Sequence, residues 1–206
     1  MQANGKIKLQ IVLSSEARQA LYDEGRLVGD RSRIFDEDMF PAYQWMALKM
    51  QEKLGVPVDV NDPWPVWAWS SWADQGDVDP NDEEFEDKDL WVLTFEAEPD
   101  QVLLSDFIAW HHVVVGWYLP DLYSADGGQA EVESFSAALE AAGVDFSDRP
   151  YPAPIQERVT ESWNRVFDVN HENLTVQATF WALYASQVIK EEPCKGTVPD
   201  LALKCA

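Results

Sequence analysis

The sequence lacks the short motifs that assign a reaction to a protein. No glycine-rich phosphate loop, HExxH motif, GxSxG motif or CxxC pair occurs in its 206 residues. These motifs mark nucleotide, metallopeptidase, serine-hydrolase and zinc or redox sites. No catalytic residue can therefore be named from a motif, and the sequence leaves open whether the chain is an enzyme.

Cysteines, signal-like segments and long apolar runs are also scarce. The two cysteines, Cys194 and Cys205, match no metal motif and are too few for a disulfide framework, so we expect a reduced, cytoplasmic protein. The opening residues MQANGKIKLQ hold no apolar core of a signal peptide. No stretch approaches the roughly 20 apolar residues of a membrane helix, so we expect no membrane partner.

Basic residues are few. Fifteen Lys and Arg side chains stand against 37 Asp and Glu side chains, which gives a formal net charge of −22. A field of this sign repels phosphate, so we expect no direct binding to nucleic acid. The charge fits solubility, a basic protein partner whose nucleic-acid site the acidic surface occupies, or a salt-loving host. The last is disfavoured, because lysine is not depleted relative to arginine and large aromatic residues are abundant.

The residues that are present fit one globular domain with an unusual number of tryptophans. Hydrophobic residues make up 46% of the chain, an ordinary level for a soluble protein, and the length fits a single domain over 1–206. The ten tryptophans suit a core, a ligand pocket or an interface. An indole buries a large area and its N–H usually needs a partner, so composition does not choose among the three.

Hydrophobic periodicity divides the chain into interleaved strands and helices. We expect strands at 6–13, 64–72, 90–98, 102–107 and 174–184, and helices at 15–24, 39–54, 131–142 and 155–166. Residues 108–119 fit either element, the segment with Arg26, Arg31 and Arg33 is expected to be a loop, and 1–5 and 193–206 are expected to be loosely ordered tails. The short strands predict an α+β class: a single compact domain with a mixed or antiparallel sheet and several flanking helices.

Residues 74–89 form the most acidic segment of the chain. A run this polar is expected to be a mobile loop. Its Asp spacing resembles a calcium loop, but the glycine and the terminal glutamate are out of register, so we expect no metal site. If the acidity serves a basic protein partner, the residues expected to contact it are Asp82, Glu83, Glu84, Glu86 and Asp87.

Two segments combine polar and aromatic residues in a way that suits a site. In the segment 105–112, Asp106 can orient a histidine for acid–base chemistry, or it can cap a helix that begins at Phe107. In PVWAW (65–69), Trp67 and Trp69 share one strand face, where they can stack on a planar ligand or form an aromatic core.

A third such segment is QATFW (177–181), where the side chains at 177, 179 and 181 share one face. That face suits a polar pocket or an exposed sheet surface, and a buried one needs hydrogen-bond partners. We expect the candidate ligand-binding residues to converge on one concave site if the chain binds a small molecule. They are Trp67, Trp69, Asp106, Trp110, His111, Ser162, Arg165, Gln177, Thr179 and Trp181.

Four blocks in a fixed order carry a family resemblance. They are PVWAW (65–69), VLLSDF-x-AWH (102–111), SWxRVFD (162–168) and QATFW (177–181). From the first strand through residue 189, the chain resembles a bacterial family catalogued only as a domain of unknown function, which implies no activity. The resemblance implies a second acidic residue where Ile108 stands and basic residues after the WAW strand, where this chain has Ser70, Ser71 and the acidic segment.

A second resemblance is architectural and concerns compact NAD-using ADP-ribosyltransferases. The opening strand, the helix that ends near Gly25, the second helix and the strand that runs into PDQVLLSD are similar to theirs in order. The resemblance implies NAD or another nucleotide as a ligand. The glutamate that such enzymes carry late in the chain has no counterpart, because Gln177 and Thr179 occupy the comparable strand.

Two functions of different classes follow from the sequence. The first is a domain that binds a small molecule or a nucleotide in an aromatic and polar pocket. The second is an acidic protein-interaction module, such as a phage- or host-encoded inhibitor or DNA mimic that acts on a basic nucleic-acid-binding partner. The sequence does not fix the oligomeric state.

Overall fold

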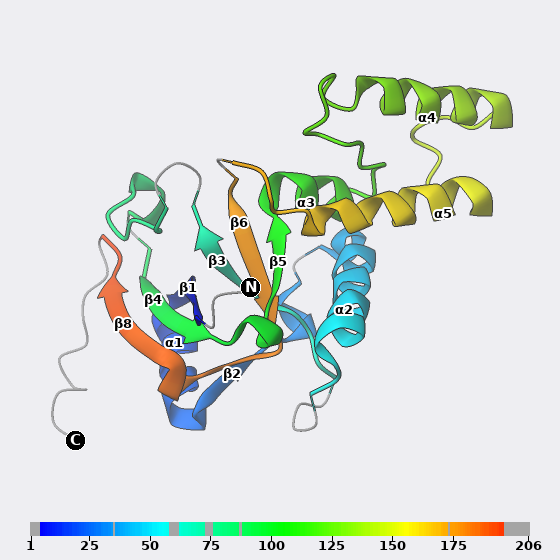
Figure 1. Ribbon diagram of the computed structural model, residues 1–206. Coiled ribbons are helices and arrows are strands. Elements are labelled where there is room, and N and C mark those ends of the chain that lie inside the picture. Colours follow the sequence, from blue (N-terminus) through cyan, green and yellow to red (C-terminus); the bar gives the residue numbers. More distant parts are fainter. Residues whose placement is uncertain are drawn as a thin grey trace, which may run out of the picture.

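A six-stranded antiparallel sheet forms the centre of the molecule (Figure 1). The computed structural model describes residues 5–34, 36–57, 62–72, 76–86, 88–172 and 174–195. The strands lie in the order β5–β6–β3–β1–β4–β8, and a second sheet pairs β2 with β7. Their bounds are β1 Ile7–Ser14, β2 Arg26–Val28, β3 Val66–Ser71, β4 Leu90–Ala97, β5 Leu103–Asp106, β6 Val176–Phe180, β7 Ala182–Tyr184 and β8 Val188–Pro193. The predicted α+β class is confirmed, with an antiparallel sheet.

Helix α1 (Ser15–Glu24) covers one face of the sheet. The Ser14 hydroxyl accepts a hydrogen bond from the Ala17 N–H at 3.1 Å and so caps the start of the helix. Gly25, at φ 76°, ends it in the left-handed conformation that suits glycine. The apolar side of α1 packs on alternate residues of the sheet, and the buried cluster includes Leu9, Ile11, Leu13, Ala17, Leu21, Leu93, Phe95 and Phe180.

The opposite face carries the other helices over its β3–β6–β5 half. Helices α2 (Phe40–Leu54), α3 (Phe107–Val114) and α5 (Ala153–Ser162) enclose a second core. Helix α4 (Gln129–Ala142) joins this core through Phe135 and Leu139, and Figure 1 shows it as an arm that lies beyond α5. The ambiguous segment 108–119 is therefore helical as far as Val114. No helix in the described part of the chain is long and apolar enough to cross a membrane.

The acidic segment covers the β1–β4–β8 half of the same face. Val78 and Phe85 are buried against Val92 and Cys194, and Phe85 sits in a short 3₁₀ helix, Glu83–Phe85. The Val78 N–H also donates to Gln10 Oε1 at 2.7 Å. The described residues 76–86 thus form a loop with one short 3₁₀ helix, and two apolar side chains among the carboxylates anchor it to the sheet.

Three short strands depart from the sequence prediction. The predicted strand 174–184 breaks at Trp181, and its second part, β7, leaves the main sheet to pair with β2, in the segment expected to be a loop. Strand β8 was not predicted at all. It pairs with β4 from Phe95 to Trp91, and Cys194 behind it is buried, so the ordered chain continues past the predicted boundary at 193.

Strands β1 and β3 pair at one position. Strand β1 pairs with β4 along its whole length, from Ile7 to Ser14, but it meets β3 in the register Gln10↔Trp69 alone. Beyond this point, toward the end of β1 and the beginning of β3, the strands separate. The sheet is therefore divided at its centre, and a cavity lies in the division.

Candidate functional site: the cleft between β1 and β3

A cavity of about 220 Å³ lies where the two central strands separate. We call it the β1–β3 cleft. It is bounded by the end of β1, the beginning of β3, the segment that follows β2, and one side chain of α2. The lining residues are Ile11, Val12, Leu13, Leu27, Val28, Gly29, Asp30, Arg33, Ile34, Tyr43, Trp64, Pro65, Val66 and Trp67.

Aromatic residues with unused hydrogen-bond donors line the cleft. The Nε1 atoms of Trp64 and Trp67 are buried and have no hydrogen-bond partner in the described part of the chain. Tyr43 packs edge-on against Trp67 with ring centroids 5.7 Å apart, and burial raises the pKa of its hydroxyl, so that group remains a donor at neutral pH. Buried donors are nearly always satisfied in proteins, so the two indole N–H groups call for an acceptor.

A short basic turn borders the cleft. Arg31–Arg33 forms a 3₁₀ turn that Asp30 caps, accepting the Ser32 N–H at 2.8 Å. That hydrogen bond is the main reason the pKa of Asp30 lies below its usual value, with a smaller contribution from the Arg33 guanidinium. Arg33 is exposed and makes no ion pair within the described residues, while the guanidinium of Arg31 lies 4.2 Å from the centroid of the Phe40 ring.

Gly29 permits the close approach that shapes the cleft wall. A Cβ atom at this position would lie 2.1 Å from the carbonyl oxygen of Trp64, which is backbone and cannot rotate away. The segment after β2 can therefore lie against the start of β3 only because residue 29 has no side chain.

The ten predicted ligand-binding residues do not line one cavity. Trp67 alone among them lines the cleft, although two others are its neighbours. The Trp110 ring lies 4.8 Å from the Trp67 ring, and Thr179 stands opposite Trp67 in the β3–β6 pair. The Thr179 hydroxyl donates its hydrogen bond to the Leu103 carbonyl at 3.3 Å, within the sheet, and so is not available as a donor to a ligand.

Trp69 and Gln177 belong to a polar row across the sheet. Gln177 stands between Trp69 on β3 and Ser105 on β5, and Trp69 in turn faces Gln10 on β1. Gln177 is 4% exposed, and neither its Nε2 nor the Ser105 Oγ has a partner among the described groups. The face carrying Gln177 is thus buried, not an exposed sheet surface.

The remaining predicted side chains are mostly engaged in structural contacts. Asp106 caps α3, and His111 Nδ1 lies 2.8 Å from the Phe107 carbonyl oxygen one turn earlier. The Ser162 hydroxyl accepts the Leu119 N–H at 2.9 Å, and Arg165 forms a two-point ion pair with Glu131. Trp181 donates to the Gly55 carbonyl at 2.9 Å. Trp181 and Arg165 each line a cavity other than the cleft.

Sequence reasoning missed most of the cleft. Arg33, Tyr43 and Trp64 were each visible, as a basic stretch, a helix stripe and the residue before PVWAW, but nothing in the sequence indicated that they meet. The one residue that hints at a close contact here is Gly29, a glycine between a short apolar run and the basic turn. Its role appears only once Trp64 is placed beside it.

Some of the acidic residues expected to contact a basic protein partner already make contacts within the chain. Glu83 and Glu84 are exposed, Asp82 accepts the Glu84 N–H at 2.9 Å, and Glu86 pairs with Lys195 at 3.0 Å. Asp87 lies outside the described residues. Within those residues, no group of three or more His, Cys, Asp or Glu side chains is placed to hold a metal ion.

Comparison with known families places the chain in one of them. A family model described as a domain of unknown function, DUF3841, matches residues 14–189. No match was found among curated proteins or among solved structures. The matched range includes the cleft residues from Leu27 through Trp67 and begins just after the three that β1 contributes, Ile11, Val12 and Leu13.

Proposed function

Because the chain belongs to the DUF3841 family of uncharacterised domains, which supplies no activity, we propose from the site itself that the β1–β3 cleft binds a small planar molecule rich in hydrogen-bond acceptors, with a nucleotide as the first candidate. The observation that carries the proposal is the surplus of donors. Two indole N–H groups, one tyrosine hydroxyl and one arginine belong to residues that line the cavity, against one carboxylate at Asp30.

The geometry suits a flat ring with an anionic substituent. Tyr43 and Trp67 supply aromatic surfaces on which a planar group can pack. Arg33 lies at the border and Arg31 in the same turn, where a phosphate or carboxylate can meet a guanidinium fork. In a chain of net charge −22, an anion needs such a local cation to approach.

The architectural resemblance to NAD-using ADP-ribosyltransferases makes NAD the most informative ligand to test. We propose binding without group transfer, because the strand next to β3 carries Gln177 and Thr179 where those enzymes carry a glutamate. Gln177 is 4% exposed, and Thr179 is fully buried and hydrogen-bonded within the sheet. Neither side chain supplies a carboxylate.

Calorimetric titration with NAD, ADP, adenosine and nicotinamide tests the proposal. We expect the phosphorylated ligands to bind and to raise the midpoint of thermal unfolding, since a ligand at about 100 times its Kd adds roughly 2.7 kcal/mol. Arg33→Gln should weaken the phosphorylated ligands about tenfold, equivalent to ~1.4 kcal/mol, and leave adenosine unchanged. Arg158→Gln, a half-exposed arginine on α5 outside the cleft, is the matched control and should change neither affinity.

Two results would contradict the proposal. One is the absence of heat and of any unfolding shift with all four ligands at millimolar concentration. The other is binding that Arg33→Gln and Trp67→Phe both leave intact, because Trp67→Phe keeps a ring but removes the N–H. The second result would move the ligand out of the cleft.

We also propose, as a second function, that the acidic segment contacts a basic protein. The burial of Phe85 fixes the 3₁₀ helix so that Glu83 and Glu84 stand exposed, without ion pairs to other described residues. Glu83→Gln with Glu84→Gln should weaken such a complex most at low salt. The same two changes at Glu133 and Glu140 of α4 are the control, and equal binding by both double variants would exclude the segment.

A further inference from the structure

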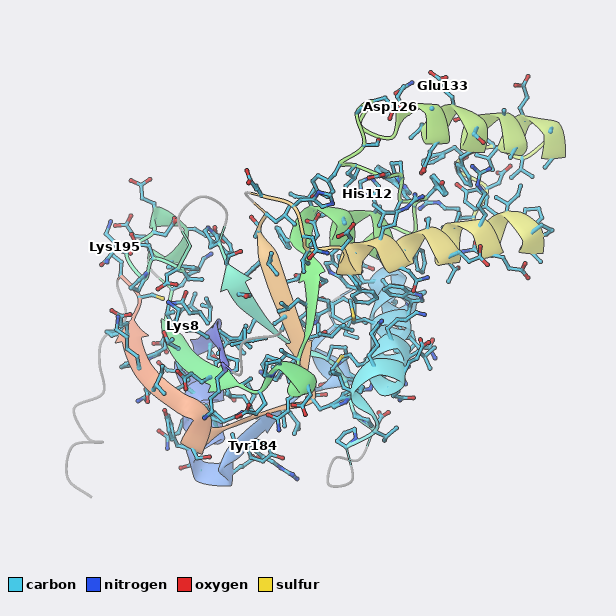
Figure 2. The ribbon with its side chains drawn as sticks, in the orientation of Figure 1. Lys8, His112, Asp126, Glu133, Tyr184 and Lys195 are labelled. Atoms are coloured by element: carbon cyan, nitrogen blue, oxygen red, sulfur yellow. The ribbon has the colours of Figure 1, made fainter. Side chains whose placement is uncertain are left out.

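A second, larger cavity opens at the end of the sheet away from the α4 arm. Its volume is about 330 Å³, within the usual range for small-molecule sites. It lies among the ends of α2, β4 and β6 and the β7 segment. Figure 2 shows Tyr184, one of its rim residues, at the opposite end of the molecule from Asp126 and Glu133. None of its lining residues belongs to the β1–β3 cleft.

The floor of this cavity is aromatic. Phe95 and Phe180 lie edge-to-face with their ring centroids 5.3 Å apart, and both are almost fully buried. Trp181 forms the adjoining wall, and its N–H is already donated to the Gly55 carbonyl, so the indole offers its ring and not a donor. A surface of this kind favours an apolar, ring-shaped group, because aromatic rings pack on one another and binding removes apolar area from water.

The rim carries charge of one sign. Asp100 is the one residue with a formal charge among the described residues that line the cavity; it is exposed and makes no ion pair within the described chain. Gln187 uses its Oε1 on the Tyr184 N–H. Arg26 stands opposite Tyr184 in the β2–β7 pair, but it does not line the cavity. The rim therefore favours a cation, and the net charge of −22 acts in the same direction.

From the aromatic floor and the acidic rim together, we infer that this cavity binds a small aromatic amine. The ring lies on Phe95, Phe180 and Trp181, and the ammonium group lies at the Asp100 carboxylate. The ring supplies most of the binding free energy through buried area, and the ion pair selects the charge. The site is independent of the nucleotide proposal, because the two cavities share no residue.

Three indole compounds that differ in one substituent test the inference: tryptamine, the neutral alcohol tryptophol and the anion indole-3-acetate. Titrations followed by NMR, on the full chain at low salt, should rank the affinities in that order. The perturbed signals should be the Ala97 and Ala182 methyls and the Trp181 indole. Asp100→Asn should weaken tryptamine about five- to tenfold and leave tryptophol unchanged, while Glu133→Gln on α4 should change neither.

Ala182→Leu adds a bulky group at the cavity wall and should weaken all three compounds, with the urea midpoint measured to show that the variant folds. Equal affinity for the amine and the acid would overturn the charge assignment. The absence of perturbation at the Trp181 indole with millimolar tryptamine would overturn the site. If Ala182→Leu does not fold, the response of tryptamine to Asp100→Asn still decides the inference. Binding of NAD in the cleft is measured separately, so either proposal can fail alone.

Discussion

Asp106 shows at the scale of one residue how a catalytic-looking side chain can be structural. It is fully buried, and its carboxylate accepts the N–H groups of Ile108 at 2.8 Å and Ala109 at 3.4 Å, as well as the hydroxyl of Tyr123. The capping alternative raised by the sequence is therefore confirmed. The carboxylate holds the start of α3 and the loop that carries Tyr123, a residue 17 positions away.

We predict that Tyr123→Phe lowers the free energy of unfolding by about 1–2 kcal/mol, because it removes one hydrogen bond to a buried charge. Asp106→Asn should cost a similar amount or more, since the amide is a weaker acceptor. Urea unfolding of both single variants and the double variant measures the coupling between them. Strict additivity would show that the hydroxyl and the carboxylate do not act together.

The same hydroxyl gives a prediction for alkaline pH. Burial and then the bond to Asp106 raise the pKa of Tyr123 above its ordinary value, and burial and the bond to Glu191 do the same for Tyr22. A raised pKa in the folded state means that the folded protein holds the proton more tightly. The stabilisation is therefore complete below the unfolded pKa of about 10 and is lost as pH rises above it.

We therefore expect the urea midpoint to be unaffected by these two tyrosines between pH 7 and 9 and to fall above pH 10. Tyr123→Phe should make that fall shallower, while the wild-type and variant curves stay parallel below pH 9. A variant with the same slope as the wild type above pH 10 would show that Tyr123 does not contribute to it.

At the scale of elements, β8 is secured by one carboxylate that faces α1. Glu191 accepts a hydrogen bond from Arg18 Nε at 2.5 Å and another from the Tyr22 hydroxyl, and the Arg18 guanidinium lies over the Trp91 ring. Its neighbour Glu192 pairs with Lys190 within the same strand at a more exposed position. The two glutamates are adjacent and equally charged, so they form a matched pair.

We predict that Glu191→Gln lowers the free energy of unfolding by about 1–3 kcal/mol, because it weakens two hydrogen bonds to a partly buried charge. Glu192→Gln should change it by less than about 1 kcal/mol, the usual limit for an exposed pair. Chemical unfolding of the two variants under one set of conditions decides the matter. Equal effects would show that β8 is not held through α1.

The elements differ in how far the sequence could predict them. Strand β1 and helix α2 were predictable from a regular apolar period, and β4 from a nearly continuous run of apolar and aromatic residues before Pro99. Strands β2, β7 and β8 were not, because three to six residues with mixed or charged side chains give no period. Their pairing depends on which segments meet in space, and this is fixed only by the complete sheet.

The candidate site was less predictable for the same reason. Trp67 and Trp69 were correctly placed on one strand face, yet only Trp67 reaches the cleft, because β3 pairs with β1 at Trp69 and the cavity lies on the side of Trp67, toward the beginning of β3. A break in pairing between two strands has no signature in either strand. Arg33 and Tyr43 reach the same cavity from elsewhere in the chain, so periodicity within one element could not join them.

At the scale of the whole molecule, the excess of acidic residues sets two opposing responses to salt. Salt weakens the ion pairs that the structure contains, such as Lys8–Asp77 and Arg165–Glu131, both exposed and each contributing up to about 1 kcal/mol. Salt also screens the mutual repulsion of a chain with net charge −22, in which 37 carboxylates face 15 basic groups. The repulsion is greater in the folded state, where the charges lie closer together.

We predict that the screening of repulsion between carboxylates outweighs the weakening of the ion pairs. The basic groups cannot pair with more than a minority of the carboxylates, and repulsion extends over many pairs within the Debye length of about 10 Å at 0.1 M salt. Raising NaCl from 0.05 to 0.5 M should therefore increase the free energy of unfolding by on the order of 1–2 kcal/mol, comparable with two surface pairs. Urea titrations at both concentrations measure the change, and KCl at equal ionic strength controls for ion identity. A midpoint that falls with salt would mean that the few ion pairs, including Lys8–Asp77 and Lys195–Glu86 on the acidic segment, outweigh the repulsion and hold that segment in place.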